Sequence, residues 1–406
     1  NTAALTNTAC FGELALSGEC GPIKGLLPAL IASKRAGQSV IIPKQNCTEA
    51  ALLRDFPIQL ATSLSEICSS LNGGGTLPRV EPLQPSRPGC ETQDLAEVYG
   101  QYKAKRALEI AAAGGHHMLM MGPPGTGKSM LAQRLNTILP PMSEDEAMAS
   151  ATIRSVCQMP VIPDNWLQRP FQSPHHTVSG IALVGGGRNP RPGEISLAHN
   201  GVLFLDELAE FDRRAIEVLR EPLETGRIHI SRAASKAEFP AQFQLIAAMN
   251  PCPGGCDSIQ ACDCSPEQLN RYRNKLSAPL LDRIDIQIEL ARVEHRQMIA
   301  EREESVETSS EIRERVGAAR DLQMARQGCI NAHLGNHELA RVCDLDRKHE
   351  SILIAAIDKL HLSTRGYHKL LKLTRTIADL AAKVQICETH IAEAISYRRQ
   401  VKRHPY

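Results

Sequence analysis

Several features that would define a class of protein are scarce or missing in this chain of 406 residues. Lysine and arginine (46 together) almost balance aspartate and glutamate (45), so no overall charge excess points to a polyanionic partner. Aromatic residues make up 3% of the chain, which argues against a dedicated platform on which nucleic-acid bases stack. No run of eighteen apolar residues is present, so the sequence predicts no membrane partner.

The chain also lacks an initiator methionine and the pattern of a signal peptide. It opens at Asn1 in the middle of a regular pattern, so we expect a fragment of a longer protein. Thirteen cysteines without a secretory signal indicate the reducing cytoplasm rather than a disulfide scaffold.

One segment is more informative than any other. Eight residues fit the phosphate-binding pattern G-x-x-x-x-G-K-[ST] at every fixed position: Gly122, Pro123, Pro124, Gly125, Thr126, Gly127, Lys128 and Ser129. The apolar run 118–121 before them indicates a buried strand, and 130–139 after them a helix. In such a loop backbone N–H groups surround a phosphate, Lys128 reaches the β- and γ-phosphates, and Ser129 binds Mg²⁺. The segment therefore predicts ATP and Mg²⁺ as cofactors.

Two further strands end in polar residues that suit the same chemistry. The apolar run 202–205 ends in Asp206 and Glu207; the first acid would hold Mg²⁺ and the second would polarise an attacking water. The strand 243–249 ends in Asn250, whose amide would position the γ-phosphate or the water. An Asx turn before Pro251 is an equally good interpretation of Asn250 from the sequence alone.

Composition divides the chain into four regions. Residues 1–71 mix short strand and helix signals, and 72–93 have the glycines and prolines of a linker. Residues 94–290 follow the strand–loop–helix pattern of a doubly wound α/β domain, and 291–406 show only helical patterns.

The order of these motifs, followed by Leu280-Leu-Asp-Arg-Ile-Asp285, resembles the magnesium-chelatase-like branch of AAA+ ATPases. The segments 173–179, 193–201 and 248–253 resemble the bacterial YifB/ComM family more closely. The resemblance implies a P-loop AAA+ fold, with a doubly wound parallel sheet and a helical lid. It also implies self-association into a ring, expected to be a hexamer, with ATP bound between subunits.

The resemblance further assigns roles to arginines outside the phosphate loop. Arg283 matches the arginine finger that reaches a neighbour's γ-phosphate, although an ion pair with Asp282 or Asp285 is the alternative. Arg365 matches the second sensor on the lid, and Arg375 is its rival on the same expected helix.

Residues 1–71 resemble the C-terminal half of the proteolytic domain of Lon proteases, on the patterns at 12–18, 24–28 and 39–43. Lon-type proteolysis needs a serine activated by a lysine. In our alignment Leu27 occupies the lysine position, and leucine cannot carry a proton. We therefore expect a partial Lon-protease-like α/β domain without peptidase activity.

The resemblance makes DNA, single-stranded or branched, the expected substrate of the motor. A hairpin predicted over 224–236 places Arg227, Arg232 and Lys236 where related rings insert a loop into their pore, although most charged hairpins are merely solvated. The expected function is a helicase for branch migration in recombination or natural transformation. The alternatives are a motor that drives metal insertion into a porphyrin and a protein-remodelling chaperone.

Four of the cysteines lie within thirteen residues: Cys252, Cys256, Cys262 and Cys264. Two pairs of thiolates with a short spacer are able to form a tetrahedral zinc site. The spacing departs from the usual Cys-x₂-Cys pairs, so a structural zinc site and four reduced thiols in an irregular loop both remain open.

Overall fold

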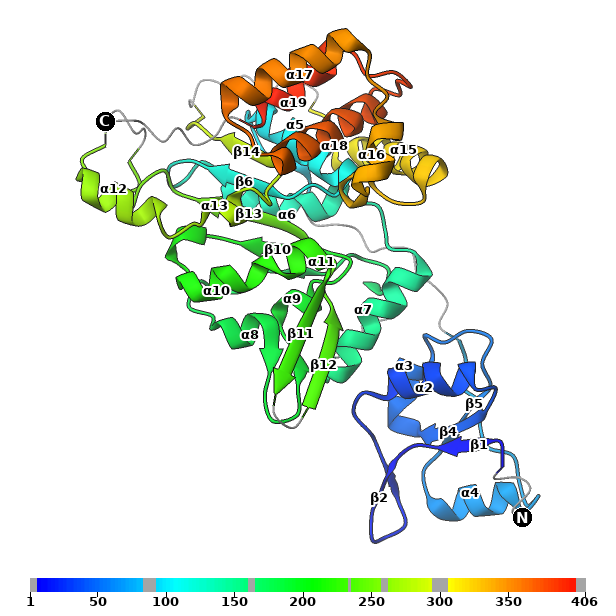
Figure 1. The fold of residues 1–406 in the computed structure, drawn as a ribbon. Helices are drawn as coiled ribbons and strands as arrows, with labels where there is room; N and C mark the ends of the chain where they lie inside the picture. Colours follow the sequence, from blue (N-terminus) through cyan, green and yellow to red (C-terminus); the bar gives the residue numbers. More distant parts are fainter. Residues whose placement is uncertain are drawn as a thin grey trace. The chain divides into compact units, whose positions relative to one another are not determined.

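The computed structural model describes residues 6–82, 93–159, 165–232, 235–256, 262–293 and 306–398. Its contacts divide the chain into two compact units, drawn in Figure 1. The first unit comprises Asn1–Cys90, Met142–Gln168 and Gly186–Pro192. The second comprises Glu91–Pro141, Arg169–Gly185 and Gly193–Tyr406. The units therefore interleave along the sequence, which a single boundary at the predicted linker 72–93 does not anticipate.

The first unit is built on a parallel three-stranded sheet in the order β1 (Thr8–Cys10), β4 (Ser39–Pro43), β5 (Ile58–Ala61). Helix α2 (Leu26–Arg35) packs on this sheet and carries Leu27, which is fully buried in the apolar core. The residue that replaces the catalytic lysine in our alignment therefore has a packing role. The likeness of this unit to a Lon protease stays a prediction.

Helix α7 (Glu144–Val156) explains why a segment from the middle of the chain belongs to the first unit. Ala151 on this helix joins the apolar cluster around α2. Ser155 accepts a hydrogen bond from the backbone N–H of Leu27 at 3.3 Å. Glu144 forms an ion pair with Arg54 at 2.7 Å. These contacts are long-range in sequence, so the local pattern does not reveal them.

The second unit is built on a parallel five-stranded sheet. Its order in space is β14 (Ile286–Glu289), β6 (Met118–Met121), β13 (Gln244–Met249), β10 (Val202–Leu205) and β7 (Phe171–Gln172). After β6 the chain crosses to the far edge at β7, returns strand by strand through β10 and β13, and then places β14 on the other side of β6. This arrangement confirms the doubly wound parallel sheet.

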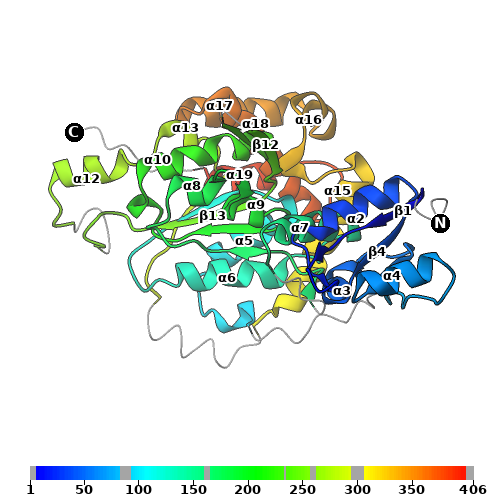
Figure 2. The ribbon, with the colours of Figure 1, turned by 90° about the horizontal axis from the view of Figure 1, so that it is seen from below.

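Both faces of this sheet are covered, as its nearly continuous apolar strands require. Side chains that alternate along β6 separate into two clusters: Met118 and Met120 face α5 (Tyr102–Gly114) and α6 (Lys128–Ile138), while Leu119 and Met121 face the other side. Figure 2 shows α6 on one side of β13, with α8 (Gly180–Val184) and α10 (Arg213–Glu217) on the other.

Helices make up the described C-terminal part from Ser309 onward, as predicted. They are α15 (Ser309–Gln327), α16 (Asn336–Val342), α17 (Arg347–Leu360), α18 (Thr364–Leu380) and α19 (Glu388–Ser396). Thr308 and Glu311 form a capping box at the start of α15, and Gly328 ends it in the left-handed conformation. The apolar side chains of α15 and α18 join the core that contains α5 and one face of the sheet.

The hairpin predicted over 224–236 is present, shifted toward the C-terminus, as the antiparallel pair β11 (Arg227–Arg232) and β12 (Ser235–Pro240). The remaining elements are short: β2 (Glu13–Leu14), β3 (Cys20–Gly21), α3 (Cys47–Ala50), α4 (Leu64–Leu71), β8 (Gly185–Gly186), β9 (Arg191–Pro192), α9 (Glu194–Leu197), α11 (Pro222–Thr225), α12 (Pro266–Arg273) and α13 (Ala278–Leu281). Among the described helices, none combines the length and the apolar character that a membrane crossing needs.

A buried histidine joins the sheet to the lid helices. His116, just before β6, is fully buried, and its Nε2 lies 2.8 Å from the hydroxyl of Thr376 on α18. Burial lowers the pKa of His116 to about 4, and the nearby Asp285 carboxylate only partly opposes this. The imidazole is therefore neutral in the folded protein at pH 7.

Because His116 is buried in its neutral form, we expect the folded protein to lose stability in mild acid. The unfolded state takes up a proton near pH 6.5, whereas the folded state takes it up only near pH 4. The contribution is therefore complete well above pH 6.5 and falls by about 1.6 kcal/mol between pH 6.5 and pH 5. We expect His116→Gln to weaken this part of the pH dependence, as measured by urea unfolding at both pH values. His337→Gln on the exposed surface of α16 is the control, and equal slopes in the two variants would contradict the assignment.

Candidate functional site

The carboxyl ends of β6, β10 and β13 lie next to one another at one edge of the sheet. The phosphate-binding loop follows β6, Asp206 and Glu207 follow β10, and Asn250 follows β13. The doubly wound topology therefore brings together residues that are up to 128 positions apart in sequence. Ligands of open α/β sheets bind at this kind of edge.

Lys128 is held inside the loop that it terminates. Its ammonium donates hydrogen bonds to the carbonyl oxygens of Gly122 at 2.6 Å and Pro123 at 2.8 Å, and to Oδ1 of Asn250 at 3.2 Å. Burial lowers the pKa of Lys128, while the carboxylates of Asp206 and Glu207 oppose that shift. Groups that follow β6 and β13 therefore hold the ammonium by hydrogen bonds, and the two acids that follow β10 stabilise its positive charge.

The loop needs its glycines for backbone reasons. Gly125 and Gly127 adopt φ values of 78° and 84°, in the left-handed region that residues with a side chain rarely occupy. A Cβ atom on Gly122 would lie 2.7 Å from the carbonyl oxygen of Leu290. The chain can therefore turn sharply at the N-terminus of α6, and the N-terminus of a helix suits an anion.

Ser129 and Asp206 form a pair of oxygen donors beside Lys128. The Ser129 hydroxyl donates to Oδ2 of Asp206 at 2.6 Å. A hydroxyl and a carboxylate in contact fit Mg²⁺, which prefers a few oxygen ligands from the protein together with phosphate oxygens.

Glu207 follows in a strained conformation. Its φ of 50° lies in the left-handed region, and its N–H donates to Oδ1 of Asp206 at 2.9 Å. Its carboxylate lies 3.2 Å from Nδ1 of His176. Left-handed backbone at a residue with a side chain is costly and is concentrated at functional sites.

Asn250 contributes both its side chain and its backbone. The Oδ1 atom accepts a hydrogen bond from Lys128, and the carbonyl oxygen accepts one from the Tyr272 hydroxyl at 3.2 Å. The Asn250 side chain therefore belongs to the site. This favours a role in positioning phosphate or water over an Asx turn before Pro251.

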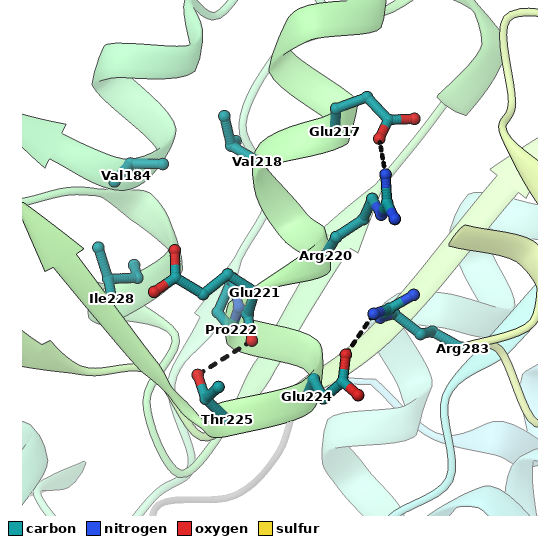
Figure 3. A pocket seen from close by; sticks show the side chains of 10 residues that line it. All are labelled: Val184, Glu217, Val218, Arg220, Glu221, Pro222, Glu224, Thr225, Ile228 and Arg283. Carbon is teal, nitrogen blue, oxygen red and sulfur yellow. Dashed lines mark hydrogen bonds and ion pairs between the residues drawn. The ribbon is translucent and has the colours of Figure 1, made fainter. Parts of the chain in front are cut away.

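Arg283 and Arg365 meet on a single carboxylate. Glu224 at the end of α11 pairs with Arg283 through one oxygen and with Arg365 through the other, the latter at 2.6 Å. Figure 3 shows Arg283 and Glu224 at one side of a cavity of about 500 Å³. Within the described part of the chain, neither guanidinium has a hydrogen bond to the phosphate-binding loop. The ion pair of Arg283 is therefore with Glu224 rather than with Asp282 or Asp285.

Arg375 has a different environment. Its side chain is 3% exposed and is bound to Asp379 at 3.0 Å and to the carbonyl oxygen of Val384 at 2.7 Å. Arg365 is 44% exposed at the first turn of α18. Arg375 therefore joins parts of the lid to one another, whereas Arg365 is accessible.

The hairpin carries a mixed charge. Arg227 pairs across the strands with Glu238, which also lies 3.6 Å from Nδ1 of His229. Lys236 is exposed, and the side chain of Arg232 lies outside the described residues. The basic character predicted for this hairpin is therefore partly neutralised.

The cysteine cluster converges in space. One sulfur from each of Cys252, Cys256, Cys262 and Cys264 lies within 4.8 Å of the others. All four thiols are free.

The sequence alone did not identify three residues of these sites: Glu224, His176 and Tyr272. Glu224 sits in a run of acidic and apolar residues that resembles any short helix. His176 lies in the segment 173–179, where no local spacing pairs it with Glu207, and Tyr272 belongs to a helix that follows the cysteines. Each acts through a contact that is distant in sequence, so no local pattern indicates it.

Comparison with known proteins places this geometry in a family. The family profile described as magnesium chelatase, subunit ChlI, matches residues 94–298, and the profile of the ChlI C-terminal region matches residues 306–398. The first match contains the phosphate-binding loop, both acids, Asn250 and Arg283; the second contains Arg365.

Relatives extend the match to nearly the whole chain. The competence protein ComM of Haemophilus influenzae is 47% identical over 96% of this chain and 77% of its own length. The protein YifB of Escherichia coli is 44% identical over 95% of this chain and 76% of its own length. The magnesium-chelatase 67 kDa subunit of Heliobacterium mobile is 28% identical over 40% of this chain and 29% of its own length. The chain belongs to the YifB/ComM family of magnesium-chelatase-like AAA+ proteins.

Proposed function

We propose that the chain hydrolyses ATP at the edge where β6, β10 and β13 end. The observation that carries this proposal is the convergence of Lys128, the Ser129–Asp206 pair and Asn250. Phosphoryl transfer depends mainly on positioning and on electrostatic stabilisation, and this set supplies both.

Each residue has a distinct task in this reaction. The Lys128 ammonium would leave its carbonyl partners for the β- and γ-phosphates, and Ser129 and Asp206 would hold Mg²⁺. The metal ion, when bound, neutralises charge on the phosphate oxygens. Glu207 accepts a proton from the attacking water, and Asn250 orients that water.

His176 is expected to hold the Glu207 carboxylate in place, because the two side chains are in contact at 3.2 Å. In this proposal it is a positioning residue.

We further propose that a second copy of the chain completes the site. Arg283 and Arg365 bind Glu224 instead of this chain's own phosphate loop, although guanidinium groups suit phosphate oxygens. A neighbouring subunit's γ-phosphate would replace Glu224 as their partner. Heterologous contacts of this kind generate rings, and a hexamer is the expected closure.

The proposed substrate of the motor is DNA, in recombination or the uptake of transforming DNA, with branch migration as the expected reaction. Its support is the similarity over nearly the whole chain to a competence protein, together with the exposed Lys236 on the hairpin. The second candidate is a motor for metal insertion into a porphyrin. The magnesium chelatase profiles support it, but the named chelatase subunit matches only 40% of the chain.

Stimulation of ATP hydrolysis is the first test of this substrate. We expect a four-way DNA junction to raise steady-state turnover several-fold at low salt and to lose this effect at raised salt, because phosphate contacts release counterions. Glu207→Gln is the inactive control and should remain without turnover on DNA.

If no DNA changes the rate of ATP hydrolysis, while a chelatase partner or unfolded protein raises it, DNA is excluded as the substrate. Such a result would leave the ATP site standing and place the metal-insertion or chaperone alternatives ahead.

Mixing two inactive variants tests the shared site. Arg283→Ala removes the finger and Lys128→Ala removes the phosphate contact, and we expect each variant alone to lose turnover on the order of a thousandfold. Random mixing leaves about one interface in four with both residues, so a 1:1 mixture should regain about a quarter of the native turnover. A mixture that stays inactive, although mixed rings are detected by mass spectrometry, would contradict a site completed in trans.

Arg365 and Arg375 form a matched pair for a further test. We expect Arg365→Ala to lower turnover on the order of a hundredfold without changing thermal stability, because it removes a donor to developing charge. Arg375→Ala should instead destabilise the chain by about 3 kcal/mol, because it leaves buried partners unpaired. Calorimetry and ATP turnover on both variants decide the assignment, and the opposite pattern would make Arg375 the sensor.

A further inference from the structure

The four-cysteine cluster is a built site rather than a chance grouping. In a tetrahedral thiolate site with metal–sulfur bonds of about 2.3 Å, the sulfurs lie about 3.8 Å apart. The sulfurs of Cys252, Cys256, Cys262 and Cys264 are all within 4.8 Å of one another, so a small contraction brings them to that geometry.

The backbone around the cluster is shaped to admit the sulfurs. The N–H of Cys256 donates to Sγ of Cys252 at 3.2 Å, which is the contact that a thiolate needs. Gly254 lies between these cysteines, and a Cβ atom there would be 2.9 Å from Sγ of Cys264. Only a residue without a side chain therefore allows the fourth sulfur to approach.

The composition of the cluster restricts the metal to ions that prefer thiolate ligands. Four soft thiolates at tetrahedral spacing suit zinc and exclude magnesium and calcium, which take oxygen ligands. Cys252 is 1% exposed, so its thiol faces the protein interior, while the other three complete the cluster from its partly exposed side. This is the arrangement of a closed structural site.

The cluster is attached to the nucleotide site at two points. Cys252 follows Asn250 by two residues, and Gly255 lies so close to the phosphate loop that a Cβ atom would be 3.0 Å from Cγ of Pro124. On the other side, Cys264 immediately precedes the capping box of α12, whose buried Tyr272 donates to the carbonyl oxygen of Asn250. Both ends of the cluster are therefore linked to Asn250, one through the backbone and the other through the Tyr272 hydrogen bond.

We propose that Cys252, Cys256, Cys262 and Cys264 bind one structural Zn²⁺ that holds Asn250 and Pro124 in the geometry for ATP hydrolysis. Without the metal, four thiols tie the two segments together only weakly, and both the Asn250 amide and α12 lose a fixed anchor. The effect on turnover rests on the proposed ATPase function, whereas the metal binding does not.

Metal content and turnover of the full chain test this proposal together. Protein purified under reducing conditions should contain about one zinc ion per chain, as measured by inductively coupled plasma mass spectrometry. Cys262→Ser and Cys264→Ser should lower bound zinc by more than about tenfold. Cys68→Ser, at an exposed thiol of α4 in the first unit, is the matched control and should retain the metal.

A reversible experiment guards against variants that fail to fold. Removal of zinc from the native chain with a chelator should lower ATP turnover on the order of tenfold, and addition of zinc should restore it. Replacement by Co²⁺ should give the absorption bands of a tetrahedral thiolate complex, and Gly254→Ala should weaken them.

Zinc content and ATP turnover together distinguish failure of the metal site from failure of the proposed ATPase function. Native protein with full turnover but no zinc, iron in place of zinc, or disulfides among these cysteines would overturn the site. Bound zinc whose removal leaves turnover unchanged would overturn its role at Asn250. Zinc at one equivalent in a chain that hydrolyses no ATP would leave the metal site intact and refute the proposed ATPase function instead.

Discussion

The position of β6 between β13 and β14 is the constraint on which the rest of the second unit depends. Parallel pairing aligns Met118 with Ile246 on one side and with Ile286 on the other, so three strands end at the same edge. A shift by one residue would exchange the two apolar faces of β6 and would move the phosphate loop away from Asn250. The register that buries the methionines therefore also places the Lys128 ammonium against the amide of Asn250.

Glu224 gives the two arginines a partner within the chain. Burial of a guanidinium is costly unless its charge is paired, and the side chain of Arg283 is only 10% exposed. The hydrogen bond from Arg283 lowers the pKa of Glu224, so the carboxylate remains charged. Because Glu224 stands three residues before Arg227, any departure of the arginines for a phosphate would act at the base of the hairpin.

The sequence predicted the elements whose causes are local, and missed those whose causes are distant. Eight consecutive residues defined the phosphate loop, the apolar runs located β6, β10 and β13 to within a residue, and the hairpin was placed by its alternating pattern. The assignment of α7 to the first unit rests on Leu27, Ala151 and Ser155, whose contacts cross more than a hundred residues. The meeting of Arg283 and Arg365 on Glu224 likewise depends on the folded chain.

Lys369 fixes the distance between Arg365 on helix α18 and Arg283. It lies one turn after Arg365 on α18, on the same face of the helix, and its ammonium donates to the carbonyl oxygen of Arg283 and to Oδ1 of Asp285. Burial alone would raise the pKa of Asp285, but the Lys369 ammonium holds it well below its usual range. Oδ2 of the same carboxylate accepts the N–H of His117 at 2.9 Å, just before β6. One buried ion pair therefore ties the helix that carries Arg365 to the segment that carries Arg283, and both of them to the strand that leads into the phosphate loop.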